Sequence, residues 1–126
     1  MLDTSAAILL RDGDPEVEEH VLQLGVNPFI SILTRVELEG GVYRDPELSD
    51  VLRPRLNLLL AQVDQLPFED EQAIAYGQIV ARIGFSRTRI IDRMIAAQAL
   101  VAGVALATLN PRDFRDIPDL VVEDWS

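Results

Sequence analysis

Four acidic residues lie at positions along the chain where they could meet: Asp3, Glu37, Asp92 and Asp113. Asp3 directly follows an apolar stub, Glu37 lies one helical turn after a predicted strand, and Asp113 lies in the loop after another predicted strand. The carboxyl ends of parallel strands meet at one edge of a sheet, so these three carboxylates are predicted to converge there. Asp92 is in the first turn of a predicted helix that could face the same edge.

Converging carboxylates repel one another, and the chain has no lysine to neutralise them. It also has no cysteine and a single histidine, His20, which excludes a thiolate zinc site, a cysteine nucleophile and a multi-histidine metal cage. A divalent cation would resolve the repulsion, and a ligand set made only of oxygen selects Mg²⁺ or Mn²⁺ over Zn²⁺. The residues therefore favour a magnesium or manganese site held by acidic side chains.

Each of these acids also has a purely structural interpretation. Asp3 could cap the helix that follows it, and Glu37 could complete a capping box with Thr34. Asp92 could be an ordinary acid in the first turn of a helix, and Asp113 could stabilise a turn. It is their joint placement at one sheet edge that favours the metal site.

Predicted strands and helices alternate along the chain. Short apolar runs typical of buried strands lie at 28–33, 63–68, 104–108 and 121–122, with Met1-Leu2 as a stub ahead of them. Helical spacing of apolar residues predicts helices at about 15–24, 34–43, 46–63, 69–83 and 91–102. Pro54 is expected to kink or split the third of these helices. The alternation is typical of a doubly wound α/β fold, with a mostly parallel sheet flanked by helices.

The chain is acidic overall but contains one basic stretch. The net charge is −10, and all 11 basic residues are arginine. Residues 82–112 nevertheless carry five arginines and one acid, a local balance of +4, which could form an anion-binding face or simply a solvated surface. No G-x-G-x-x-G or Gly-Lys-Ser/Thr pattern supports nucleotide binding. No apolar run approaches the roughly 20 residues of a membrane span, so a cytoplasmic protein of one domain is expected.

Five segments of the chain form a recognisable set: LDTS at 2–5, SILTRVEL at 31–38, DRMIAA at 92–97, TLNPRDF at 108–114 and VVEDW at 121–125. Together they resemble the PIN-domain ribonucleases, and specifically the VapC-type toxins of bacterial type II toxin–antitoxin pairs. The last two together, in this order and in so short a chain, are the most specific. The resemblance covers nearly the whole length and implies one PIN domain at 1–126, with a five-stranded parallel sheet.

The resemblance also implies a function, a metal-dependent RNA endonuclease that acts as a toxin. By matching positions, the acidic quartet around Mg²⁺ or Mn²⁺ would be Asp3, Glu37, Asp92 and Asp113, with Asp3 and Asp92 as the first candidates for direct ligands. Thr108 and Asn110 resemble the polar residues that orient water and Asp113. As an extension of the charge pattern, the candidates to hold the RNA backbone are Arg87, Arg89, Arg93 and Arg112.

A VapB-like antitoxin and pairing of the toxin with itself, as a homodimer or a larger assembly, follow from the same resemblance. The stretch 48–60 holds more leucine than one buried face needs, and with the apolar side of the helix at Val17 it could form a groove for an antitoxin segment. The alternative is that these leucines are plain core. A basic partner would suit the acidic toxin, because complementary fields steer association.

Two other functions are compatible with the same residues. One is a PIN-like module that binds without catalysis, and the other is a housekeeping RNA-maturation nuclease with the same site. The presence of all four acids favours a nuclease over a binding module.

The chain departs from the family pattern at its start, where only Met1 and Leu2 precede Asp3. A central strand of two residues is expected to be too short to pair well with neighbours on both sides. Either the sequence begins late or the first strand is unusually brief.

Overall fold

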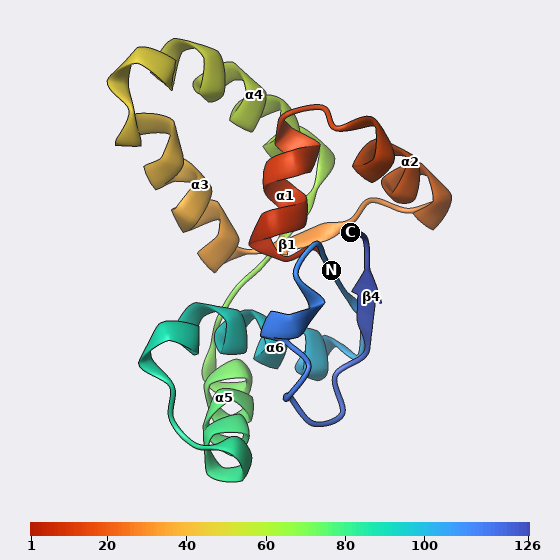
Figure 1. Ribbon diagram of the computed structural model, residues 1–126, viewed down its shortest axis with the longest axis vertical. Coiled ribbons are helices and arrows are strands. Elements are labelled where there is room, and N and C mark those ends of the chain that lie inside the picture. The colour runs from red at the N-terminus through yellow and green to blue at the C-terminus, as the bar shows by residue number, and fades with distance from the viewer.

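The computed structural model describes all 126 residues, which alternate between three-residue strands and longer helices (Figure 1). The α-helices are α1 (Thr4–Arg11), α2 (Pro15–Leu24), α3 (Ile32–Arg44), α4 (Ser49–Gln62), α5 (Asp70–Ile83) and α6 (Ile90–Ala102). The strands are β1 (Phe29–Ser31), β2 (Asp64–Leu66), β3 (Leu106–Thr108) and β4 (Val122–Asp124). Three 3₁₀ turns complete the chain: η1 (Pro46–Leu48), η2 (Arg87–Arg89) and η3 (Pro111–Asp113). No helix is both long enough and apolar enough to cross a membrane.

One buried residue joins the strands into a single parallel sheet. β1 pairs with β2 and β3 pairs with β4, while Leu2 bridges in parallel to Ile30 on one side and to Ala107 on the other. Backbone hydrogen bonds run from Leu2 N to Phe29 O (2.8 Å) and from Asp3 N to Ala107 O (3.0 Å). The order across the sheet is therefore β2, β1, Leu2, β3, β4, which is the predicted doubly wound α/β arrangement with four regular strands and one bridge.

The expectation that Met1-Leu2 is too short to pair on both sides is wrong. The Met1 amino group donates to Ala105 O (2.9 Å), and Met1 O accepts from Ala107 N (2.8 Å). Leu2 is 1% exposed, and an unpaired backbone group at so buried a residue would be costly. Burial of the amino group lowers its pKa, although the charge of Glu123 opposes the shift.

Helices cover both faces of this sheet, with α1 to α4 on one side of the strands and α5 and α6 on the other (Figure 1). Two apolar clusters match these two sides, one around Leu2, Ile30 and Leu56 and the other around Ile95 and Phe114. α5 and α6 pack closely, and Ala96, Ala97 and Ala99 of α6 are fully buried. Small side chains let a helix backbone approach its neighbours closely, so α6 is held firmly where it enters the site.

The capping box at Thr34 and the splitting of a helix at Pro54 are not observed, each for an identifiable reason. α3 begins at Ile32 because Ser31 caps it, its Oγ accepting from Leu33 N at 2.9 Å, so Thr34 is already inside the helix and the Thr34–Glu37 capping box does not form. Pro54 neither splits nor ends α4. Pro54 and Asp50, whose carbonyl loses its helical donor, are both exposed, so water can satisfy that carbonyl.

The C-terminal segment closes the outer edge of the sheet. Trp125 is 5% exposed, and its backbone N–H donates to Thr108 O at 2.9 Å. The ring of Trp125 stacks on His20 of α2, with centroids 4.8 Å apart. The single histidine of the chain therefore serves packing between α2 and the C-terminus.

Candidate active site

Asp3 is held rigidly at the end of the Leu2 bridge, where it caps α1. Its Oδ1 accepts from the backbone N of Ala6 (2.9 Å) and from Ser5 Oγ (2.7 Å), and its Oδ2 accepts from Thr108 Oγ1 (2.5 Å). The residue is only 5% exposed. A carboxylate has about four lone-pair positions, so three donors fix this one and leave Oδ2 able to bind a further group. The capping interpretation of Asp3 is confirmed, and it leaves the second oxygen available for chemistry.

Thr108 contacts Asp3, and Asn110 contacts the backbone of Asp113. Thr108 is fully buried and donates to Asp3 rather than to Asp113. Its Oγ1 accepts from the backbone N of Asn110 (2.9 Å), and Asn110 O accepts from Asp113 N (3.0 Å). The backbone of Asn110 thus ties Thr108 to the turn η3 that carries Asp113.

Glu37 reaches the site from the second turn of α3. Its Oε1 accepts from Thr4 Oγ1 at 2.8 Å, and Thr4 Oγ1 lies 3.0 Å from Thr34 Oγ1. The side chain of Glu37 is otherwise exposed. Sequence reasoning missed Thr4 and Ser5 as supports of the two acids, although a hydroxyl pair directly after Asp3, at a helix start, is a signal that could have found them.

Asp92 lies in the first turn of α6, and the other three acids act on its charge. The pKa of Asp92 is raised to about 6, first by burial and then by the negative charges of Asp113, Asp3 and Glu37 in that order. Arg89 opposes the shift. Asp92 therefore feels the charges of the other three acids predicted from the sequence. As placed, no three of the four acids are close enough to surround a metal ion.

Asp113 is the only one of the four acids that contacts a cation. Arg89 Nη1 donates to the backbone O of Asp113 at 2.9 Å and lies 3.4 Å from its Oδ1. Both side chains remain partly exposed, at 37% for Arg89 and 43% for Asp113. A guanidinium therefore stands at the rim of the acidic site, where it can reach a bound anion.

The remaining predicted arginines separate into one buried and two exposed residues. Arg93 is 4% exposed, and it donates to Gly84 O (2.7 Å) and to Asp116 Oδ2 (3.4 Å). This inward placement, which joins the loops before η2 and after η3, does not fit the prediction that Arg93 contacts RNA. Arg87 and Arg112 are exposed and form no ion pair.

The model of the PIN domain family matches residues 1–120. The tRNA(fMet)-specific endonuclease VapC of Salmonella typhimurium is 31% identical over 133 aligned residues, which cover 99% of this chain and 96% of the relative. Ribonuclease VapC1 of Haemophilus influenzae is 30% identical, covering 100% of this chain and 97% of the relative. A crystal structure of DNA-bound VapBC from Salmonella typhimurium superposes with a TM-score of 0.85 at 28% identity, covering 100% of this chain and 97% of that one.

The chain therefore belongs to the PIN-domain family, whose model and fold it matches over nearly its whole length. Within that family its relatives place it among the VapC-type ribonucleases. The family resemblance predicted from the sequence segments is thus confirmed.

Proposed function

We propose that the chain is a metal-dependent RNA endonuclease of the VapC type, whose active site is the group of four acids Asp3, Glu37, Asp92 and Asp113. The observation that carries this proposal is the raised pKa of Asp92, because three further carboxylates cause part of it and only one of them, Asp113, has a cationic partner. A chain gains no stability from gathering like charges around a half-buried acid. Such an arrangement is typical of a functional site.

The donors at this site suit a hard divalent cation. All the candidate ligands are carboxylate oxygens, and neither histidine nor cysteine is present among them, a set typical of Mg²⁺ or Mn²⁺. Asp3 Oδ2 has a free lone-pair position, and the charge of Asp92 is repelled by the neighbouring acids. These two residues are therefore our first candidates for direct ligands.

The chain's own residues would orient the reaction. Three donors hold the Asp3 carboxylate in one orientation, and Thr4 holds that of Glu37. Arg89 would bind a phosphate oxygen of the RNA substrate, exchanging its contact with Asp113 for one with the phosphate. A divalent ion, when bound, would make a water molecule acidic enough to attack and would stabilise charge on the phosphate.

The test is a substitution that removes one charge at the site. Asp92→Asn should abolish Mg²⁺-dependent RNA cleavage, with a loss of at least about 10³-fold, because it removes a proposed metal ligand. Asp70→Asn is the matched control, since Asp70 is an exposed acid in the first turn of α5. Circular dichroism checks that both variants fold. An Asp92→Asn protein that cuts at the wild-type rate ends the proposal, and it would also favour the alternative of a binding module.

The first substrate to test is initiator tRNA. The Salmonella relative is a tRNA(fMet)-specific endonuclease, and we propose a structured RNA of this kind for this chain. A housekeeping RNA-maturation nuclease, the other alternative, would trim precursor RNA and leave growth unharmed when expressed.

We also propose a VapB-like antitoxin as partner, because a solved relative is a VapBC complex. An open groove of about 550 Å³ lies beside α2, with Leu10, Val21, Leu22 and Val26 among its lining residues. Leu22 and Val26 are 75% and 71% exposed, so the groove offers apolar surface. The predicted leucine stretch is divided. Leu56 and Leu59 belong to the core, whereas Leu48, Val51 and Leu58 are exposed but do not line this groove.

The antitoxin proposal predicts a genetic result. Expression of the chain alone should stop growth, and co-expression of a small protein encoded beside it should restore growth and co-purify with it. Leu22→Glu should weaken that co-purification by placing a charge on the groove. Growth arrest that no neighbouring gene relieves would contradict the proposal.

A further inference from the structure

A second groove, which we call the arginine groove, adjoins the acidic site at η3. It has a volume of about 560 Å³, and Arg89, Arg112, Asp113 and Arg115 are among its lining residues. Arg89 and Asp113 belong to the acidic site as well, so the two features are continuous. Only one lining residue of the groove is hydrophobic, which fits a charged or strongly polar occupant.

Two arginines of this groove have no acidic partner within the chain. Arg112 and Arg115 are both exposed, and neither forms an ion pair or a side-chain hydrogen bond within the chain. The chain has 21 acids for 11 arginines, so most arginines find a carboxylate partner. Two free guanidinium groups beside an acidic pocket are therefore available for an anion from outside the chain.

The two sides of the acidic site differ in the residues that form them. Thr4, Thr34 and Glu37 occupy the side formed by α1 and α3. Arg35, the arginine of α3 nearest to Glu37 in sequence, is engaged by Glu39 (3.4 Å) and Gln65 (3.2 Å). An extended polyanion that crosses the acidic site would consequently be held more tightly on the η3 side.

We propose that the arginine groove binds successive phosphates of the RNA strand on one side of the cut, with Arg112 and Arg115 as the contacts. The inference rests on the proposed function, because it takes RNA as the occupant. Arg115 thereby replaces the buried Arg93 among the residues that hold the backbone. Phosphate contacts of this kind fix the register of the strand without reading its sequence.

The test is a double variant, Arg112→Ala/Arg115→Ala, measured against Arg44→Ala/Arg55→Ala. Arg44 and Arg55 are exposed residues of α3 and α4, so the control removes the same charge elsewhere. The groove variant should raise KM by about tenfold with kcat unchanged, because it loses two solvent-exposed charge contacts. It should also lower the slope of log affinity against log salt concentration by about 1.4. The conservative variant Arg112→Lys/Arg115→Lys should bring both KM and the salt dependence most of the way back to the wild-type values.

Shortened substrates test the one-sided placement. RNA trimmed on one side of the cut should bind wild type and the groove variant alike, whereas RNA trimmed on the other side should keep the full difference. A difference that survives both trims, or that both trims remove, overturns the proposal. So does an equal effect of the control variant.

The test of the arginine groove can be separated from the test of the nuclease assignment. Binding of the same RNA is measured in EDTA by fluorescence anisotropy, where no cleavage is expected. A wild-type protein that cuts RNA but shows no arginine dependence in KM or in anisotropy refutes the groove alone. Asp92→Asn that still cuts refutes the catalytic assignment, and the anisotropy result then decides the groove by itself.

Discussion

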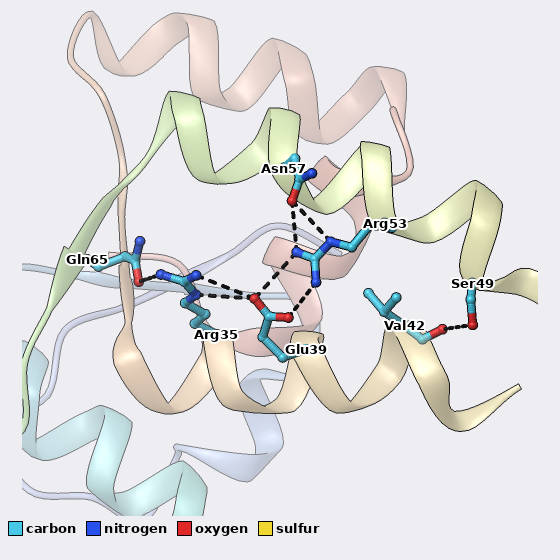
Figure 2. A network of polar contacts seen from close by, with 7 residues as sticks. All are labelled: Arg35, Glu39, Val42, Ser49, Arg53, Asn57 and Gln65. Carbon is cyan, nitrogen blue, oxygen red and sulfur yellow. Dashed lines mark hydrogen bonds and ion pairs between the residues drawn. The ribbon is translucent and has the colours of Figure 1, made fainter. Parts of the chain in front are cut away.

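Glu39 and Asp92 are both partly buried carboxylates on helices, yet the chain surrounds them with opposite charges. Glu39 lies between two arginines: Arg53 Nη1 is 2.6 Å from its Oε2, and Arg35 Nε is 3.4 Å from its Oε1 (Figure 2). Hydrogen bonding from Arg53 lowers the pKa of Glu39, and the charge of Arg35 acts in the same direction. Burial and three further acids instead raise the pKa of Asp92.

The polar network around Glu39 is arranged as a structural connection should be. Arg53 is also held by Asn57 (2.8 Å), and Arg35 by Gln65 (3.2 Å), so the network joins α3 to α4 and to β2 (Figure 2). Each charge there has a partner. In the acidic site three of the four carboxylates have no cationic partner. This contrast supports the proposal that a cation from outside the chain binds there.

The sharpest way to break this comparison uses two residues of one helix. Glu37→Gln should lower the rate of RNA cleavage by about 10²-fold, because it removes one charge from the proposed metal environment. Glu39→Gln, two residues further along α3, should leave the rate near that of wild type. Single-turnover cleavage at fixed Mg²⁺ measures both. Equal rates for the two variants would mean that the contrast in charge carries no functional information.

The sequence predicts that the acids lie together, because a sheet of parallel strands brings the ends of its strands to one edge whatever the exact strand lengths. Asp3 and Asp113 follow strands, so this prediction needs only the order of the elements. The same reasoning predicted the fold class. Strand boundaries were less accurate, since each observed strand has three residues and Ser31 ends β1 by capping the next helix.

What could not be predicted depends on side-chain direction. Arg93 and Arg115 are both arginines near predicted acids, and nothing in their spacing shows that one is 4% exposed and the other lies open in a groove. Burial of Arg93 follows from the carbonyl of Gly84 and the carboxylate of Asp116, which meet it only in the folded chain. The double pairing of Leu2 is likewise a tertiary result, because it needs Ile30 and Ala107 on either side.

The smallest predicted effect concerns the stability of the fold. Neutralising Asp92 and neutralising Glu39 should change it in opposite directions. The pKa of Asp92 is raised from 3.8 to about 6, so the native state holds its proton more tightly than the unfolded state does. That stabilisation is complete below pH 3.8 and is lost as the pH rises through about 6. At pH 7 without metal, Asp92→Asn should therefore stabilise the fold by about 1 kcal/mol, discounted for partial solvent screening, and this gain should vanish near pH 4.

Glu39→Gln is the counterpart in the same measurement. Because the pKa of Glu39 is lowered from 4.5, its stabilisation is present above that pH and is lost as the pH falls. Its removal should lower Tm at pH 7 by about 1–2 °C, while Asp92→Asn should raise Tm by about 3 °C. Thermal unfolding in EDTA at pH 7 and pH 4 measures both. A lower Tm for Asp92→Asn at pH 7 would show that Asp92 is a structural acid, and the charge arrangement would then no longer support a metal site.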